Sequence, residues 1–101
     1  MRKRSELGMI FKKILGSNNV YFSPPSGKKL EYPCIIYSLK DVNTRSADNQ
    51  NYIQNRLYDV QLIDPDPDTK IINDILAIPR SRFHNSYAAG NMMHYNFTIN
   101  F

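Results

Sequence analysis

Apolar and polar residues alternate most regularly near the end of the chain. From Met93 onward, every odd-numbered residue is apolar and every even-numbered residue is polar, which is the two-residue period of a strand with one buried face. A second run, a few residues upstream, alternates in the same way. A three-residue turn at residues 89–91 would pair Tyr87 with Met93 and Phe83 with Phe97, and would place both apolar sets on one face. The pattern therefore predicts a β-hairpin that closes the chain.

A strand that turns directly into a helix is predicted upstream of that hairpin. Apolar and polar residues alternate between Tyr58 and Leu62. The run DPDPD at residues 64–68 then ends the strand, because proline has no N–H to donate to a neighbouring strand. We expect Asp68 to cap the amino end of the helix. Isoleucine and leucine residues recur after it at helical spacing, until Pro79 discourages continuation.

The amino-terminal half adds one helix and two strands. Residues 2–15 place their apolar side chains on one stripe of a helix, and Met9 falls opposite that stripe, where it is either exposed or in contact with another subunit. A short strand is predicted at residues 20–22 and a longer one at residues 33–39. The order of elements predicts a single α+β domain over residues 1–101, with an antiparallel sheet of about four to five strands and two helices packed on one face.

A polar segment at residues 41–55 interrupts this pattern. Its first eleven residues are almost free of large apolar side chains. The segment is either a long loop or the projecting tip of a β-hairpin. We interpret it as a projecting arm that contacts a neighbouring molecule, the alternative being disorder in the isolated protein. The candidate interface residues are Met9 in the helix and, in the arm, Asn43, Thr44, Arg45, Asp48, Asn49 and Gln50.

Charge is distributed unevenly along the chain. The formal net charge is +4. Residues 1–45 hold nine lysines and arginines against three acidic residues, whereas residues 46–101 hold four against six. Such polarity is typical of a protein that works near nucleic acid or an acidic partner. A solvated surface nevertheless accounts for most of these charges.

The single cysteine and the apolar runs bear on the cellular compartment. One cysteine, Cys34, excludes an internal disulfide, which fits a reducing compartment. Its apolar neighbours indicate a buried, unreactive side chain. No apolar run is long enough to span a bilayer. Residues 1–4 resemble the start of a signal peptide, but Lys12 and Lys13 interrupt what would be its apolar core.

A search for catalytic or metal-binding residues returns weak candidates. His84 and His94 would lie on the solvent side of the closing hairpin, with His84 opposite Asn96, but a third metal ligand is missing from that face. The aspartates of residues 64–68 alternate like a calcium loop, yet prolines separate them, and the required glycine and distal glutamate are absent. We therefore expect no enzymatic activity, no metal and no cofactor.

Two strand motifs follow one another in a recognisable order. Residues 32–39 read YPCIIYSL, and a polar segment containing residues 47–49 and Tyr52 comes next. Residues 58–64 then read YDVQLID, ahead of the Asp-Pro run and the closing hairpin. The first motif resembles the YPxIxY strand, and the second the YxVxxID strand, of small tail-completion proteins, or tail terminators, from long-tailed double-stranded DNA phages. The resemblance covers most of residues 20–101.

This resemblance implies a structural virion protein without catalytic residues. Proteins of this family are small α+β subunits that cap the end of the assembled tail tube, commonly as a ring of six copies. The implied partners are further copies of the chain, the tail-tube protein and the neck or head-completion protein. DNA would pass through the ring without specific recognition. The expected location is the virion, after assembly in the host bacterial cytoplasm, with no membrane involved.

The alternative is a small basic nucleic-acid-binding or antitoxin-like module. The seven tyrosines and five phenylalanines could stack on bases. Most of them, however, lie at inward positions of the predicted strands, where core packing accounts for them. No RNA-recognition motif or DNA-reading helix is visible. Salt-sensitive DNA binding by a monomer or dimer would favour this module over the ring.

Overall fold

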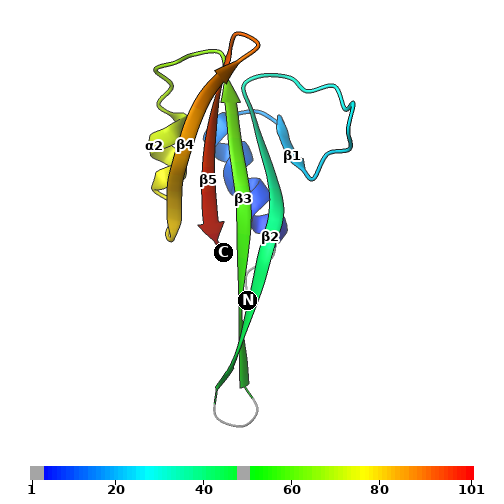
Figure 1. Cartoon of the computed structure of the whole chain (residues 1–101), viewed down its shortest axis with the longest axis vertical. Helices are drawn as coiled ribbons and strands as arrows, with labels where there is room; N and C mark the ends of the chain where they lie inside the picture. The colour runs from blue at the N-terminus through cyan, green and yellow to red at the C-terminus, as the bar shows by residue number, and fades with distance from the viewer. Residues whose placement is uncertain (1–3, 48–50) are drawn as a thin grey trace.

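The computed structural model describes residues 4–47 and 51–101, with side chains described for residues 4–42 and 56–101. Seven elements follow in the order helix, three strands, helix, two strands, as predicted. Figure 1 shows them as α1 (Arg4–Leu15), β1 (Val20–Phe22), β2 (Cys34–Ala47), β3 (Asn51–Asp64), α2 (Ile71–Leu76), β4 (Ser81–Ala89) and β5 (Met92–Asn100).

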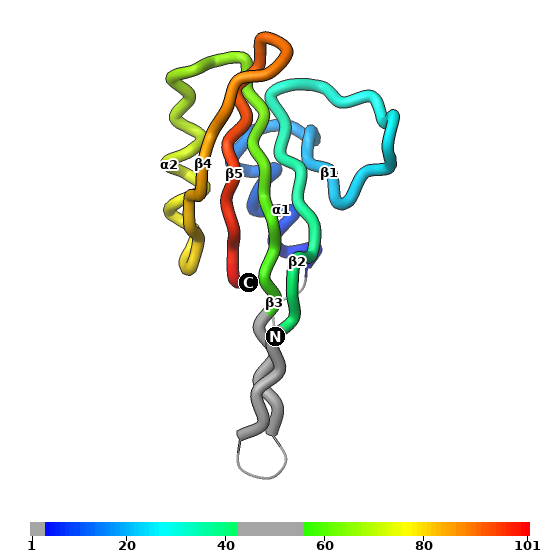
Figure 2. Tube along the Cα trace, in the orientation of Figure 1, coloured from blue at the N-terminus to red at the C-terminus, as the bar shows by residue number. Residues whose placement is uncertain are grey.

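The five strands form one sheet in the order β1-β2-β3-β5-β4. Every neighbouring pair is antiparallel except β1 and β2, which are parallel. The predicted α+β class is therefore confirmed, while the expectation of a fully antiparallel sheet is wrong for β1. The reason is the connection: residues 23–33 carry the chain back beside β1 before β2 begins, so both strands run in one direction (Figure 2).

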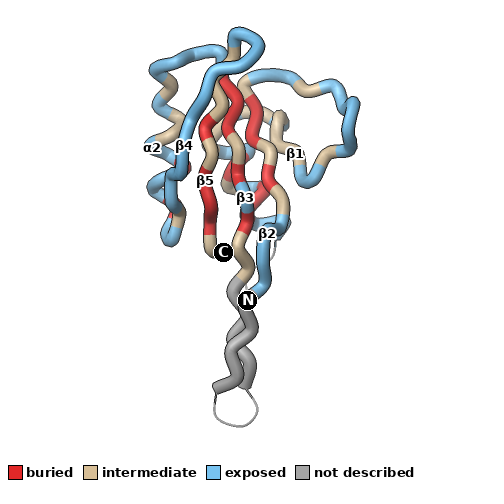
Figure 3. The backbone as a smooth tube through the Cα atoms, viewed as in Figure 1, coloured by how far each residue is buried: buried red, intermediate tan, exposed pale blue. Residues whose placement is uncertain are grey.

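The core lies between the sheet and the two helices. Alternate residues of the three inner strands point to this side, which we call the helix face, and Figure 3 shows burial concentrated along those strands. Leu7 and Phe11 of α1 and Ile75 of α2 pack against them, and all three are fully buried. Burying a side chain of this size contributes about 1.5–3 kcal/mol. The predicted placement of both helices on one face is confirmed.

Helix α1 approaches the sheet closely at Gly8. A Cβ atom added there would lie 2.7 Å from the Tyr37 hydroxyl oxygen, so the glycine lets the helix lie close to β2. Phe11 meets the same tyrosine edge to face, with ring centroids 5.2 Å apart. The helix ends at Gly16, whose backbone φ is 71°, and the Gly16 amide donates to the Lys12 carbonyl at 2.9 Å.

The Asp-Pro run does not cap α2 as expected. Asp64 and Asp66 each accept the amide of the residue two positions later, at 2.8 and 2.9 Å, which makes two successive side-chain turns. The helix therefore begins only at Ile71, after Lys70, which makes no side-chain capping bond. The nearest side-chain acceptor is Thr69 Oγ1, which takes the Ile71 amide at 3.2 Å. The prediction that Asp68 is the N-cap is wrong.

The closing hairpin forms, but its register differs at one end. Phe83 pairs with Phe97 as predicted, whereas Tyr87 pairs with His94 instead of Met93. A bulge between Phe83 and Asn85 accounts for the shift. The turn accordingly has two residues, Gly90 and Asn91, and both have positive φ, at 59° and 62°, as a type I′ turn requires.

Candidate functional site

A two-stranded ribbon projects from one end of the sheet. Strand β3 pairs with β5 only from Leu57 to Asp64, whereas it pairs with β2 along its whole length, out to Asn51 opposite Ala47. Among the described residues, β2 is therefore its only neighbour strand beyond Leu57, and Figure 1 shows the ribbon extending past the rest of the sheet. We call this the ribbon end of the sheet, and the opposite end, at Cys34 and Asp64, the loop end. Of the two forms predicted for residues 41–55, the described backbone has that of a hairpin, because residues 41–47 pair with residues 51–57.

The predicted arm residues divide into two groups. The backbone of Asn43, Thr44 and Arg45 belongs to the ribbon, paired with residues 53–55. Asp48, Asn49 and Gln50 lie outside the described residues. At the base of the ribbon, the Val42 amide donates to the Asp41 carboxylate at 2.8 Å, next to a bulge between Leu39 and Asp41. That residues 43–50 contact another subunit stays a prediction.

Met9 lies on the outer side of α1, as predicted. Its side chain is 69% exposed, the largest exposure of any large apolar residue in the described part of the chain. Its neighbours Lys12 and Lys13 are also exposed. An apolar side chain presented singly to solvent is ordinary, so its role in an interface stays a prediction.

The two outer edges of the sheet carry most of the exposed large apolar side chains. The structure exposes eight such residues in its described part, and six lie at an edge. Phe83, Tyr87 and the adjacent Leu76 of α2 lie at the β4 edge. Phe22, Leu39 and Val42 lie at the edge formed by β1 and the part of β2 beyond it. These two edges are the main candidates for contact with other molecules.

The open face, on the side of the sheet away from the helices, carries a row of hydrogen-bonded polar side chains. Gln61 Nε2 donates to Asn96 Oδ1 at 3.0 Å, and Asn96 Nδ2 donates to Asn85 Oδ1 at 2.7 Å. Gln61 Nε2 also lies 3.2 Å from the Tyr87 hydroxyl. These groups satisfy one another across three strands, β3, β5 and β4. The row therefore stabilises the face and has no reactive group.

The two histidines lie apart on this face. His84 is the bulge residue, so Asn85, and not His84 as predicted, is opposite Asn96. His84 Nε2 lies 2.8 Å from Thr98 Oγ1. His94 stacks on Tyr87, with ring centroids 4.7 Å apart and an interplanar angle of 4°. Within the described residues, no group of three histidine, cysteine or acidic side chains could hold a metal ion.

Cys34 begins β2 and is fully buried. Burial raises the pKa of its thiol from 9.0 to about 11. A thiol with a raised pKa forms little thiolate at neutral pH and is a poor nucleophile. The predicted role as a small buried apolar residue agrees with this position.

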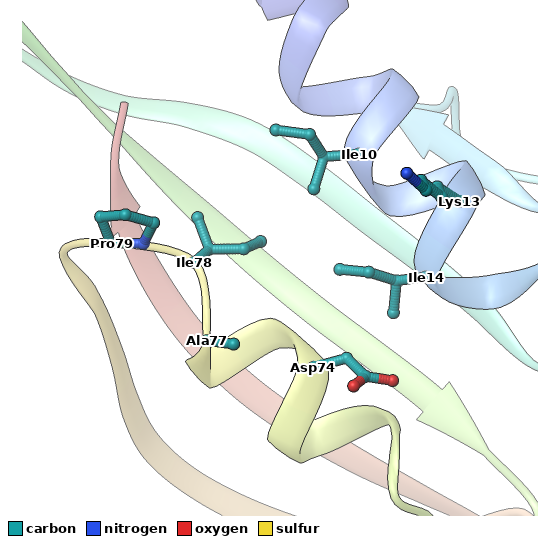
Figure 4. A pocket seen from close by; sticks show the side chains of 7 residues that line it. All are labelled: Ile10, Lys13, Ile14, Asp74, Ala77, Ile78 and Pro79. Atoms are coloured by element: carbon teal, nitrogen blue, oxygen red, sulfur yellow. The ribbon is translucent and has the colours of Figure 1, made fainter.

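A groove separates the two helices on the outside of the helix face. It has a volume of about 590 Å³, and Figure 4 shows Ile10 and Ile14 of α1 on one side and Ala77, Ile78 and Pro79 on the other. One cation, Lys13, and one anion, Asp74, also line it. Its lining holds no histidine, cysteine or hydroxyl side chain, so the groove offers contact area but no obvious catalytic chemistry.

The ribbon end of the open face is basic. Lys40, Arg80, Arg82 and His84 line a depression of about 480 Å³ there, together with uncharged residues. Lys40 Nζ lies 3.7 Å from Asp59 Oδ1, and both side chains are about half exposed, so this ion pair contributes little stability. Arg80 and Arg82 form no ion pair with another described residue. Within the described residues, the depression therefore presents two arginines that have no acidic partner.

Comparisons with known proteins leave the family open. No model of a protein family matches the chain, and no curated protein matches it. Within the part of the chain that the structure describes, no helix is long and apolar enough to cross a membrane.

Proposed function

We propose that this protein is a structural subunit that assembles side by side into a ring and caps the tail tube of a long-tailed double-stranded DNA phage. The observation that carries the proposal is the pair of unlike sheet edges, together with a ribbon that finds no third strand in its own subunit. The resemblance of residues 32–39 and 58–64 to tail-completion proteins supplies the phage context.

The direction of the edge strands supports ring assembly. Strand β4 runs opposite to β5, and β1 runs parallel to β2, so the two edge strands run in opposite directions. When a second copy is placed beside the first by rotation about an axis along the strands, β4 of one copy meets β1 of the next in antiparallel orientation. Such a head-to-tail contact joins unlike surfaces, and it forms a closed ring when the rotation divides a full turn.

The ribbon supports contact beyond the subunit. An isolated two-stranded hairpin is marginally stable in water at best. A ribbon that projects past β5 and β4 therefore gains stability when a neighbouring subunit or the tail tube covers it. The ring would act by geometry: one side would match the tail-tube protein, and the other would receive the neck or head-completion protein. DNA would pass through the ring without specific recognition, and no residue would perform catalysis.

The ring assignment is tested by removing the protein from the virion. In a phage without this gene, we expect electron micrographs to show tails of abnormal length, or finished tails and heads that fail to join. The wild-type gene supplied from a plasmid should restore infectious particles. A double histidine variant, His84→Ala with His94→Ala, should restore them as well, because neither imidazole has a catalytic role in the proposal. Normal infectious particles from the deletion phage would overturn the assignment.

A nucleic-acid-binding module remains the second candidate, because of the basic depression at the ribbon end of the open face. A module of this kind would bind DNA or RNA as a monomer or dimer, and its affinity would fall steeply with salt because phosphate contacts release counterions. The variant Arg80→Ala with Arg82→Ala separates the two candidates. It should abolish binding by the module, whereas the ring should show no tight DNA binding to lose.

A further inference from the structure

The two sheet edges carry opposite charge patterns at matching heights. At the loop end, β3 leads into residues 64–70, which hold three aspartates and one lysine, a net charge of −2. The connection of residues 23–33 ends at the same level of the sheet and holds two lysines and one glutamate, a net charge of +1. Figure 1 shows these two connections on opposite sides of the sheet, the first beside α2 and β4 and the second beside β1.

The charges responsible are free to meet another molecule. Asp66, Asp68, Lys28 and Lys29 are all exposed. Asp64 is buried, and its carboxylate accepts the Asp66 amide. The basic connection is fixed to the body through Tyr21, because its hydroxyl accepts the Glu31 amide at 3.2 Å and its ring lies 5.8 Å from Lys28 Nζ. The acidic connection is fixed by Tyr95, whose hydroxyl donates to the Pro67 carbonyl at 3.1 Å.

The ribbon end carries a second set of charges. Arg80 and Arg82 lie at the β4 edge, and both are exposed. Asp41 lies at the β2 edge on the same level of the sheet. It pairs with Leu57 of β3, and Leu57 pairs with Asn100 of β5. The Asn100 amide in turn donates to the Arg80 carbonyl at 3.2 Å. The β4 edge is therefore acidic at the loop end and basic at the ribbon end. The other edge is basic at the loop end, and at the ribbon end it holds Asp41 beside Lys40, whose charge is paired with Asp59.

We propose that the β4 edge of one copy docks on the β1–β2 edge of the next, with residues 64–70 against residues 23–33 of the neighbour and Arg80 and Arg82 against its Asp41. The occupant of each edge is thus a second copy of this chain at the same height. Opposite net charges meet at the loop end, and Arg80 and Arg82 face Asp41 at the ribbon end. The exposed apolar residues of the two edges, among them Phe83 and Leu39, are buried between the copies. This inference rests on the proposed ring and names the surfaces that build it.

Charge exchange tests the docking directly. In the acidic connection, Asp66→Asn with Asp68→Lys changes the net charge from −2 to +1, and the side-chain oxygen of the introduced asparagine can still accept the residue 68 amide. In the basic connection, Lys28→Gln with Lys29→Asp changes the net charge from +1 to −2. Either pair of substitutions alone places like charges at every interface. All four together restore opposite charges with the signs exchanged.

The readouts are oligomer mass by native mass spectrometry and rescue of the deletion phage. Each pair alone should weaken self-association at least ~10-fold at low salt, equivalent to about 1.4 kcal/mol per interface. The chain with all four substitutions should assemble and should rescue the deletion phage. An equimolar mixture of the acidic-connection variant and the basic-connection variant should do the same. The weakening should shrink in ~1 M salt, where the screening length is about 3 Å. The control is Lys12→Glu on the outer side of α1, which should leave assembly unchanged.

Three results would overturn the docking. Full assembly and phage rescue by the acidic-connection variant and by the basic-connection variant, each on its own, would show that these connections do not meet. A four-substitution chain that folds but neither assembles nor rescues would do the same. Rescue of the acidic-connection variant only by Arg80→Asp with Arg82→Asp would indicate a two-fold contact between two β4 edges. The first two results leave the proposed function standing, whereas the third contradicts a head-to-tail ring. A deletion phage that needs no rescue overturns the function itself.

Discussion

Strand β3 passes through two environments, and the contrast separates what holds the fold from what is available to other molecules. Between Leu57 and Asp64 it has a strand on each side, and Tyr58, Val60 and Leu62 are buried under the helices. Between Asn51 and Arg56 it pairs with β2 alone. The body thus stabilises the subunit, while the ribbon adds backbone pairing without a helix or a third strand to cover it. Substitutions in the body should lower stability, and changes to the ribbon should mainly lower assembly.

The largest effect on stability is expected at Phe97. This side chain is 1% exposed in the middle of the helix face, and Phe97→Ala should lower the free energy of unfolding by about 3–5 kcal/mol. Its cross-strand partner Phe83 is the matched control, because the two rings meet edge to face at 5.5 Å but Phe83 is 41% exposed. Phe83→Ala should cost about 1 kcal/mol. Equal losses in urea unfolding would contradict the assignment of β5 to the core.

The second effect is a loss of stability at alkaline pH through Cys34. Because burial raises the pKa of the thiol from 9.0 to about 11, the folded state holds this proton more tightly than the unfolded state. The resulting stability is fully present below about pH 9 and is lost as the pH rises through 11. Wild type should therefore lose up to roughly 2–3 kcal/mol more than Cys34→Ala over that range. The raised pKa values of Tyr37 and Tyr95 affect both proteins and cancel. Parallel stability curves would show that Cys34 is accessible to solvent.

A smaller effect is expected on the open face of the same strand. Asn96 accepts a hydrogen bond from Gln61 and donates one to Asn85. Both neighbours can bond to water when Asn96 is removed. Asn96→Ala should therefore cost about 1 kcal/mol or less, several-fold less than Phe97→Ala one residue away. A loss as large as that of Phe97→Ala, measured by thermal unfolding, would mean that this face is also part of the core.

The smallest effect on stability should come from removing the ribbon. Val42 pairs with Arg56, so residues 43–55 can be replaced by Asn-Gly, which forms a two-residue hairpin turn. We expect the free energy of unfolding to change by about 0.5 kcal/mol or less, because among the described elements no helix or third strand pairs with the ribbon. Ring formation and rescue of the deletion phage should nevertheless be lost. A shortened protein that still rescues would remove the ribbon from the account.

The element order could be predicted from the sequence because each strand of the body has one apolar face. Tyr58, Val60 and Leu62 fix which side of β3 is buried, and the alternation from Met93 onward does the same for β5. The errors arose where local hydrogen bonds compete with the periodic pattern. Asp64 and Asp66 bind nearby amides and delay α2, and the bulge before Asn85 shifts the hairpin by one residue. Neither the side-chain turns nor the bulge is visible in the alternation of apolar and polar residues on which the predictions rest.

The candidate surfaces were harder to predict than the fold. The polarity of residues 41–55 left two forms open, a long loop and a projecting hairpin tip. The pairing of the two sheet edges could not be predicted. Residues 64–70 lie near β4 because β5 inserts between β3 and β4. The matching heights of Asp41 and Arg80 likewise follow from the register of three strands. Such relations between distant segments are absent from the local pattern of any one of them.

The central claim is that copies of this chain close a ring at the end of the tail, and cryo-electron microscopy of purified tails tests it most directly. We expect the map to show a single closed ring at the head-proximal end of the tube, six copies by resemblance. In each contact, β4 of one copy should lie antiparallel to β1 of the next, with the ribbon covered by a neighbouring subunit or by the tube. A tail whose end carries no copies of this chain, or copies joined as two-fold pairs, would contradict the account.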